Sequence, residues 1–237
     1  MQNTGLFDKF VFQNIITTLM EHPLAQFRFC PKCGSPHFVE HDSKSKQCQD
    51  CGFVYYLNPS AATVAFIISG ERRVESGEKD DNKIQNSKFK IQNCVSSLHY
   101  PLSTIHQNPL SLLAVRRAQE PAKGTLDLPG GFSDLFETSE EGVRREVREE
   151  TGLEVNEVKF LFSLPNQYLY SDFLVHTMDM FYLCHVSDSQ HVQAMDDASE
   201  ALWIPLQDIR PEDFGLKSIR LGVEKFLANF PIYIRYK

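Results

Sequence analysis

Three glutamates, Glu146, Glu149 and Glu150, stand three and four residues apart in the second half of the chain. On a helix these positions share one face, so the three carboxylates would lie side by side. Like charges at this spacing destabilise a helix unless a cation lies among them. Clustered carboxylate oxygens suit Mg²⁺ or Mn²⁺, although a solvated acidic helix face is the common alternative. The spacing therefore indicates a divalent metal site, and Arg145 is placed to orient Glu149.

Four of the six cysteines form two Cys-x-x-Cys pairs, each followed by glycine. Cys30 and Cys33 make the first pair, and Cys48 and Cys51 make the second after a gap of fourteen residues. Four thiolates in this pattern are typical of a closed tetrahedral Zn²⁺ site, which is structural because no position stays open. A redox pair is the alternative, but two matched pairs favour zinc. We therefore predict a small zinc ribbon over 30–56, which needs the metal because it is too short to bury its own core.

Helix and strand patterns indicate what positions the glutamates. Thr138, with Glu141 three residues later, fits a capping box, and Gly152 is a helix stop, so we expect a helix over 138–152. The apolar run 61–68 predicts a buried strand. Further strands are expected at 110–115, 155–163, 177–186 and 201–204, and a last amphipathic helix at 216–230. Strands with few helices favour an α/β sandwich with a mixed sheet.

Composition limits the class of protein. Of the 237 residues, 42% are hydrophobic and 23% charged, which excludes a wholly disordered, collagen-like or coiled-coil chain. No apolar run approaches the ~20 residues of a membrane span, and residues 1–20 lack the pattern of a secretory signal. We therefore expect no membrane partner and a cytoplasmic location. The formal charge of −7 disfavours general nucleic-acid binding, while a small anionic substrate can bind where metal ions supply positive charge.

Two further segments lie outside the predicted sites. Residues 1–29 show apolar residues at helical spacing, which predicts an N-terminal helical segment. Residues 70–109 are polar and include a short repeat, so we expect a mobile insertion without chemistry inside a catalytic domain over 57–237.

The glutamates belong to a longer pattern that resembles the Nudix box. Its fixed positions are all filled, by Gly131, Glu137, Arg145-Glu146-Val147, Glu149-Glu150 and Gly152-Leu153. At typical residue usage, such a match arises by chance on the order of 10⁻⁸ times per starting point. The sequence thus resembles the Nudix hydrolase superfamily over 57–237. This resemblance implies a Nudix-type α/β/α sandwich with a mixed sheet, preceded here by the small zinc ribbon.

The resemblance also implies a reaction and roles for the box residues. Nudix proteins hydrolyse a nucleoside diphosphate linked to another group, using divalent metal held by the box. Carried over by position, Glu146 and Glu150 would be the principal metal ligands, and Glu149 would be a further ligand or the general base. Glu137 and Arg145 would order the loop and the carboxylates.

Other candidate residues follow from the same resemblance. Gly131 would let the backbone turn close to the metal, and Gly152 is the second loop glycine of the box. Family members often carry a further acid beyond the box, just before a strand with an aromatic residue. Asp197 or Glu200 is the candidate here, although loop acids without a role are equally common.

A zinc ribbon before a Nudix domain resembles the NADH pyrophosphatase branch. That branch carries a Ser-Gln-Pro-Trp-Pro-Phe-Pro-x-Ser signature after its box, of which this chain keeps Ser163, Pro165 and Ser171. The departure leaves the substrate open among NADH, ADP-ribose and related dinucleotides. Tyr168 and Tyr170 in this stretch are candidates to stack a base, although core or surface tyrosines are the commoner outcome.

We therefore expect a metal-dependent pyrophosphohydrolase for a small nucleotide-containing substrate. A nucleoside triphosphate sanitising hydrolase and removal of a nucleotide cap from RNA are the alternative enzymes, and the near-neutral ribbon disfavours nucleic acid as a partner. A non-catalytic Nudix ligand sensor is an alternative of another class, disfavoured because no box glutamate is lost. The resemblance also implies a homodimer.

Overall fold

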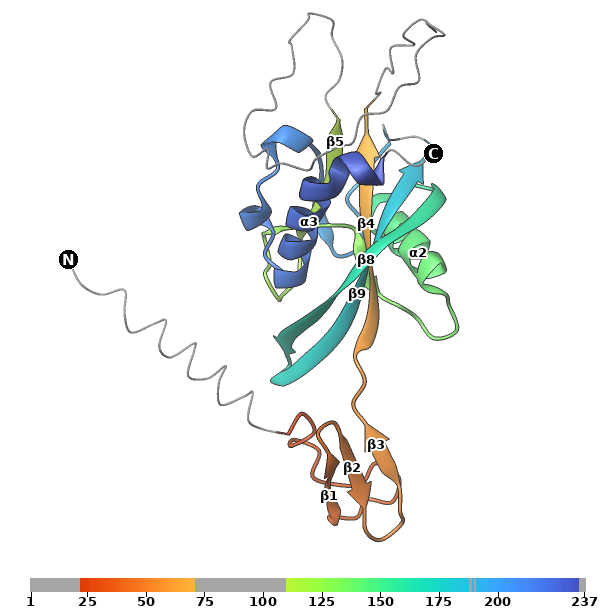
Figure 1. Cartoon of the computed structure of the whole chain (residues 1–237), viewed down its shortest axis with the longest axis vertical. Coiled ribbons are helices and arrows are strands. Elements are labelled where there is room, and N and C mark those ends of the chain that lie inside the picture. The colour runs from red at the N-terminus through yellow and green to blue at the C-terminus, as the bar shows by residue number, and fades with distance from the viewer. Residues whose placement is uncertain (1–21, 71–109, 188, 190, 235–237) are drawn as a thin grey trace, which may run out of the picture.

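The computed structural model describes residues 22–70, 110–187, 189 and 191–234, whose arrangement Figure 1 shows. The helical segment predicted over 1–29 lies mostly outside the described residues, and 22–29 form a turn followed by irregular chain. The insertion predicted over 70–109 also lies outside them, apart from Gly70. Within the described ranges, no helix is both long and apolar enough to span a membrane.

The main sheet has seven strands and is mixed, as predicted. Its order is β10-β5-β4-β9-β8, with β6 paired to β5 and β7 paired to β4. β4 (Ser60–Ser69) runs parallel to β9 (Phe173–Val186), and the other pairs are antiparallel. β8 (Val155–Tyr170) forms a long hairpin with β9, and β10 (Ala198–Pro205) pairs with β5 (Ser111–Arg117).

The sheet is split between its two central strands. β4 and β5 pair at Ile68–Leu112 and Ser69–Ser111, and their register ends there. Beyond that point β6 (Leu126–Asp127) pairs with β5, and β7 (Gly130–Phe132) pairs with β4. The 126–132 segment therefore bridges the two diverging strands and brings the start of the Nudix box to the opening.

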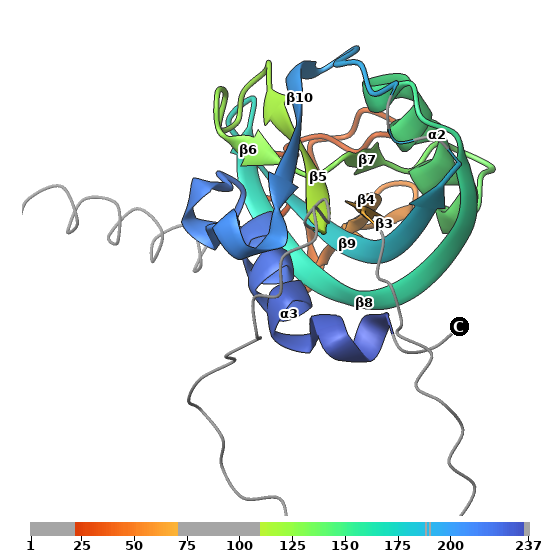
Figure 2. The same ribbon diagram turned by 90° about the horizontal axis from the view of Figure 1, so that it is seen from above.

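Two helices cover opposite faces of the sheet, as Figures 1 and 2 show. On the α3 (Lys217–Tyr233) face, Phe66 stacks on Phe226 with ring centroids 3.9 Å apart. On the α2 (Ser139–Thr151) face, Val143 and Val147 are fully buried against a second apolar cluster. Successive residues of β4 point alternately into the apolar cluster under α3 and the apolar cluster under α2, which explains the unbroken apolar sequence of this strand. The α/β/α sandwich is confirmed. Two short 3₁₀ helices, Leu206–Asp208 and Pro211–Asp213, connect β10 to α3.

The helix that carries the glutamates is fixed at both ends. Glu141 N donates to Thr138 Oγ1 at 3.2 Å, and Thr138 N donates to Glu141 Oε2 at 2.7 Å, which completes the capping box. Gly152 ends the helix with a left-handed φ of 70°, which glycine adopts without steric cost. Tyr182 of β9 donates its hydroxyl to Ser139 Oγ at 2.6 Å. These contacts set the position of α2 along the sheet.

The β8–β9 hairpin is longer than the sequence pattern predicts. β8 continues to Tyr170 rather than ending at 163, and β9 begins at Phe173 rather than 177. The two strands are joined by Ser171 and Asp172, whose φ values of 49° and 60° are both positive. Tight hairpin turns of this kind usually contain glycine or asparagine, so the sequence gives no strong turn signal here.

The N-terminal unit is a three-stranded antiparallel sheet beneath that hairpin (Figure 1). Its strands are β1 (Phe38–Asp42), β2 (Ser45–Cys48) and β3 (Val54–Tyr56). Gln26 Nε2 donates to the carbonyl oxygen of Asp172 at 2.7 Å, and the ring of Phe27 meets Phe173 edge-on at 5.6 Å. The tip of the β8–β9 hairpin therefore rests on the N-terminal unit.

Candidate active site

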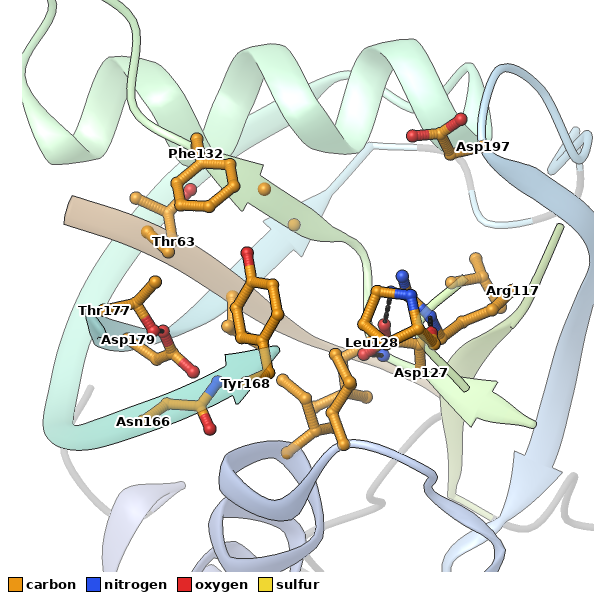
Figure 3. A pocket seen from close by; sticks show the side chains of 18 of the residues that line it. Thr63, Arg117, Asp127, Leu128, Phe132, Asn166, Tyr168, Thr177, Asp179 and Asp197 are labelled. Carbon is orange, nitrogen blue, oxygen red and sulfur yellow. Dashed lines mark hydrogen bonds and ion pairs between the residues drawn. The ribbon is translucent and has the colours of Figure 1, made fainter. Parts of the chain in front are cut away.

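A cavity of about 200 Å³ opens where β4 and β5 diverge, and Figure 3 shows it from close by. Its walls come from β4 to β9, the end of α2 and the first turn of α3. Asp127, Glu150, Asp179 and Asp197 line it, and Arg117 is the one cation among the described lining residues. The cavity is therefore acidic, so an anionic ligand needs additional positive charge to bind there.

Glu150 is the box glutamate that faces the cavity. It is 9% exposed, and its Oε2 accepts a hydrogen bond from Gly130 N at 3.2 Å. Burial raises the pKa of Glu150 to about 9, and the negative charges of Asp127, Glu146 and Asp197 add to the increase. A buried carboxylate surrounded by like charges binds a divalent cation favourably. The cation compensates for the lost hydration of the carboxylate and for the repulsion between the neighbouring negative charges.

Arg145 organises the rest of the box. Its guanidinium donates to Glu137 Oε1 at 2.8 Å, Glu146 Oε1 at 2.8 Å, Glu149 Oε2 at 3.0 Å and the carbonyl oxygen of Phe132 at 3.0 Å. The hydrogen bond from Arg145 lowers the pKa of Glu137. Burial raises the pKa of Glu146, although Arg145 acts in the opposite direction. Arg145 thus ties the loop to α2 and holds two of the three clustered carboxylates.

The glycines of the loop permit this close packing. A Cβ on Gly131 would lie 2.6 Å from Glu146 Oε1, so the carboxylate rests directly on the loop backbone. A Cβ on Gly130 would lie 2.1 Å from the carbonyl oxygen of Thr63 on β4. Gly131 lines the cavity, whereas Gly152 is the C-cap of α2 and acts by ending the helix.

The two candidates for a further acid lie in different surroundings. Asp197 lines the cavity at the entrance to β10, and its carbonyl oxygen accepts from Ala118 N at 2.9 Å. Glu200 instead forms an exposed ion pair with Arg116 at 2.9 Å. The structure thus brings Asp197 into the same cavity as Glu150 and leaves Glu200 on the outer surface.

The β8–β9 hairpin supplies the wall that Figure 3 shows on the left. Asp179 is 4% exposed, and its carboxylate accepts hydrogen bonds from the hydroxyls of Thr177 and Ser218. Ser218 lies in the first turn of α3, so Asp179 joins this helix to the sheet. A carboxylate still has acceptor capacity after two such bonds, so Asp179 can also receive a donor from a ligand.

The two tyrosines suggested for base stacking also differ. Tyr168 lines the cavity beside Asn166, and burial together with the charge of Asp179 raises its pKa. Tyr170 is 58% exposed and is absent from the described lining. Tyr168 is therefore the one of the pair that can contact a ligand in this cavity.

Several lining residues were not singled out from the sequence. Asp127 and Arg117 form an ion pair at 2.6 Å on one wall, and Asp179 lies on the other. The available signal was weak: Asp127 stands between two leucines and Asp179 between two methionines, so each places a charge in an apolar run. Such a charge must be paired or used, because burying it alone is costly.

The residues around Glu150 offer the ligand chemistry that a divalent cation prefers. Glu150, Asp127 and Asp197 line one cavity, and Glu146 is close enough to Glu150 to raise its pKa. Glu149 is bonded to Arg145 but stays 44% exposed. All of these groups are carboxylates, which are the ligands that Mg²⁺ and Mn²⁺ prefer.

The four ribbon cysteines form the cage that their spacing predicts. The sulfur atoms of Cys30, Cys33, Cys48 and Cys51 all lie within 4.8 Å of one another. The Cys30–Cys51 and Cys33–Cys48 sulfur distances are 3.7 and 3.6 Å. Tetrahedral Zn–S bonds of about 2.3 Å require sulfurs about 3.8 Å apart, so the cage fits Zn²⁺. Although burial opposes it, hydrogen bonds from the backbone N–H groups of Cys51 and Asp50 lower the pKa of Cys48 to about 6, which favours the thiolate form.

The sandwich and the glutamate-bearing loop and helix define a Nudix fold. Comparison with family models agrees, since the NUDIX domain matches residues 103–228, just over half of the chain. The chain belongs to the Nudix family. The NADH pyrophosphatase zinc ribbon domain matches residues 25–56, so the N-terminal unit is a zinc ribbon of that type.

Individual relatives support this assignment. An ADP-ribose pyrophosphatase from Methanocaldococcus jannaschii is 35% identical over 128 residues, which cover 53% of this chain and 67% of the relative. The NAD-capped RNA hydrolase NudC of Vibrio cholerae is 24% identical over 216 residues, which cover 88% of this chain. The match spans 60% of the length of that relative. A NUDIX hydrolase from Nitrosomonas europaea shares the fold, with a TM-score of 0.54 at 17% identity over 85% of this chain and 91% of its own.

Proposed function

We propose that the chain is a divalent-metal-dependent pyrophosphohydrolase that cleaves the phosphoanhydride of a nucleoside diphosphate-linked substrate. NADH, ADP-ribose or a related dinucleotide is the substrate class. The observation that carries this proposal is the position of Glu150, buried at the wall of an acidic cavity with Asp127 and Asp197 beside it. The names of the relatives, an ADP-ribose pyrophosphatase and NAD-capped RNA hydrolases, support the choice of substrate.

The proposed roles divide between binding the metal and holding its ligands. Glu146, Glu149 and Glu150 would hold Mg²⁺ or Mn²⁺, with Asp197 as a further ligand. When bound, the ion neutralises phosphoryl oxygens and lowers the pKa of a coordinated water. Glu149, which is exposed at the cluster, is the candidate to accept a proton from the attacking water.

Other residues would position these groups and the substrate. Arg145 fixes the carboxylates of Glu146 and Glu149, and Glu137 anchors Arg145 to the loop. Tyr168 lines the cavity, where its aromatic face would be available to stack on a base. Hydrolysis of an anhydride depends on positioning and charge neutralisation more than on covalent catalysis, and this arrangement supplies both.

A panel assay tests the function directly. Purified protein is incubated with Mg²⁺ or Mn²⁺ and NADH, ADP-ribose, a nucleoside triphosphate or NAD-capped RNA, and the products are separated. We expect metal-dependent cleavage of each of the first two into a mononucleotide and a second phosphorylated product. Faster cleavage of the triphosphate or of the capped RNA would favour the alternative enzymes. Binding of ADP-ribose without turnover of any substrate would favour a ligand sensor.

We also propose the organisation and setting of the whole chain. The zinc ribbon over 30–56 would be a structural unit, and the catalytic domain would extend over 57–237. The cysteines that the structure describes form no disulfide, which is usual for cysteines in the cytoplasm. A reducing compartment would keep the zinc cage from oxidising to disulfides.

A further inference from the structure

Arg117 holds an unusual position in the acidic cavity. Its side chain is 22% exposed and reaches from β5 to Asp127, whose side chain is 10% exposed (Figure 3). Among the described residues that line the cavity, four are acids and Arg117 is the only base. Each of these four acids would repel a diphosphate that enters the cavity, and Arg117 would attract it.

The guanidinium is held rigidly. Its Nη1 donates to Asp127 Oδ2 at 2.6 Å, and its Nε donates to the carbonyl oxygen of Pro121 at 2.7 Å. Its hydrogen bonds within the described chain engage Nε and Nη1, so the Nη2 group is left for a ligand. A planar guanidinium fixed in this way is pre-organised to donate to phosphoryl oxygens, because it loses little side-chain freedom on binding.

Arg117 also lies beside the proposed metal site. It pairs with Ala198 in the β5–β10 register, directly after Asp197. The N–H of the next residue, Ala118, donates to the carbonyl oxygen of Asp197 at 2.9 Å. An anhydride held near Asp197 and Glu150 would therefore come within reach of the guanidinium.

We propose that Arg117 is a substrate-binding residue that contacts the phosphoryl oxygens of the anhydride from the β5 wall. This proposal rests on the proposed function, because it assigns the residue to the same substrate and cavity. The competing explanation is that Arg117 only neutralises the buried Asp127. Breaking a buried ion pair from one side leaves an uncompensated charge, so loss of activity in a single Arg117 variant would not separate the two explanations.

A double-mutant cycle separates them. The variants are Arg117→Met, Asp127→Asn and the double variant, with Arg117→Lys as the conservative change. Arg116→Met is the matched control, because Arg116 is the neighbouring arginine and pairs with Glu200 on the exposed surface. The readouts are the thermal unfolding midpoint, kcat and KM for ADP-ribose with Mg²⁺, and the calorimetric Kd of non-hydrolysable α,β-methylene ADP-ribose.

If Arg117 binds phosphate, the double variant regains thermal stability relative to Arg117→Met, but its KM and Kd stay about tenfold or more above those of Asp127→Asn, which lacks the same carboxylate. Arg117→Lys should fall between, and Arg116→Met should match wild type. A double variant that binds the analogue and turns over ADP-ribose as well as Asp127→Asn does overturns the proposal. Wild-type protein without turnover would count against the proposed function, while the Kd comparison would still decide the role of Arg117.

Discussion

Glu150 differs from its two partners in the box by facing the cavity rather than Arg145. Its burial among like charges makes it the carboxylate with the most to gain from a cation. Glutamine has the same shape without the charge, so it keeps the acceptor for Gly130 N while removing the anionic ligand. The residue is thus the most direct test of the metal site.

We predict that Glu150→Gln lowers kcat for ADP-ribose by more than about 100-fold, since loss of a direct ligand should exceed the 10–100-fold cost typical of outer-sphere changes. The fold should survive, because glutamine is neutral and has nearly the same shape as the buried glutamate. Metal-titrated kinetics and a thermal melt measure both effects. Glu140→Gln, an exposed position in the first turn of the same helix, is the control. Equal activity of the two variants would exclude Glu150 as a ligand.

Arg145 acts through other residues, because its contacts are to the box carboxylates, to Asp134 of the loop and to the carbonyl oxygen of Phe132. Lysine keeps the charge but cannot reproduce several fixed N–H directions at once. We predict that Arg145→Lys lowers kcat about 10–100-fold and raises the Mg²⁺ concentration needed for half-maximal rate. Arg148→Lys, three residues on and exposed, should leave both values unchanged. A normal Mg²⁺ dependence in Arg145→Lys would contradict this positioning role.

The box residues could be found from sequence because one helix and one loop bring them together. Their spacing alone places Glu146, Glu149 and Glu150 on one face. Arg117 and Asp179 belong to the same cavity but lie on β5 and β9, so only the pairing of distant strands joins them. A single sequence carries no record of that pairing, and periodicity shows only that a charge falls in an apolar strand.

At the scale of elements, α2 is the part that must stay rigid for the carboxylates to act together. Its buried face holds Val143 and Val147, and its first turn is tied to β9 through Ser139 and Tyr182. The capping box adds a local contribution at the end farthest from Glu150. Cap and site can therefore be separated by experiment.

We predict that Thr138→Ala lowers the free energy of unfolding by about 1 kcal/mol, because it leaves the Glu141 N–H without its acceptor. The thermal midpoint should fall by about 2–4 °C for a chain of this size. Thr138→Ser, which keeps the hydroxyl, should melt like wild type. At 25 °C the kcat of all three proteins should agree within about twofold. A large loss of kcat in Thr138→Ala would mean that the cap controls the site geometry.

The sequence predicted the ends of an element correctly where nearby residues determine them. It underestimated strand length where pairing with a distant strand determines it. Thr138 and Gly152 mark the ends of α2 in the sequence, and the structure confirms both. The β8–β9 hairpin was predicted too short, because its turn residues, Ser171 and Asp172, adopt positive φ and neither is glycine. The residues near the tip of the hairpin are extended because the two strands pair with each other there, from Asn166–Thr177 to Tyr170–Phe173. That stabilisation comes from the partner strand and leaves little trace in either sequence alone.

At the scale of the whole molecule, the ribbon and the catalytic cavity meet at that same hairpin. The tip rests on the ribbon through Phe27–Phe173 and Gln26–Asp172. The strands behind the tip carry Tyr168 and Asp179 into the cavity wall. Among the described residues, the ribbon's fully buried cluster contains only Cys30, Phe38 and Cys48. We therefore expect its folding to depend on zinc.

Loss of zinc should therefore weaken substrate binding more than catalysis. We predict that Cys48→Ser abolishes the one bound zinc and raises KM for ADP-ribose by about 3–10-fold, as expected for losing part of one binding wall. The kcat should change less, because α2 is anchored on the other face of the sheet.

Two further variants serve as controls. Phe173→Ala removes the ring contact with Phe27 but leaves the four cysteines intact, so it should raise KM while zinc is retained. Cys184→Ala should change neither the zinc content nor KM. Metal analysis and steady-state kinetics decide the matter: an unchanged KM after complete zinc loss would show that the ribbon does not support the cavity.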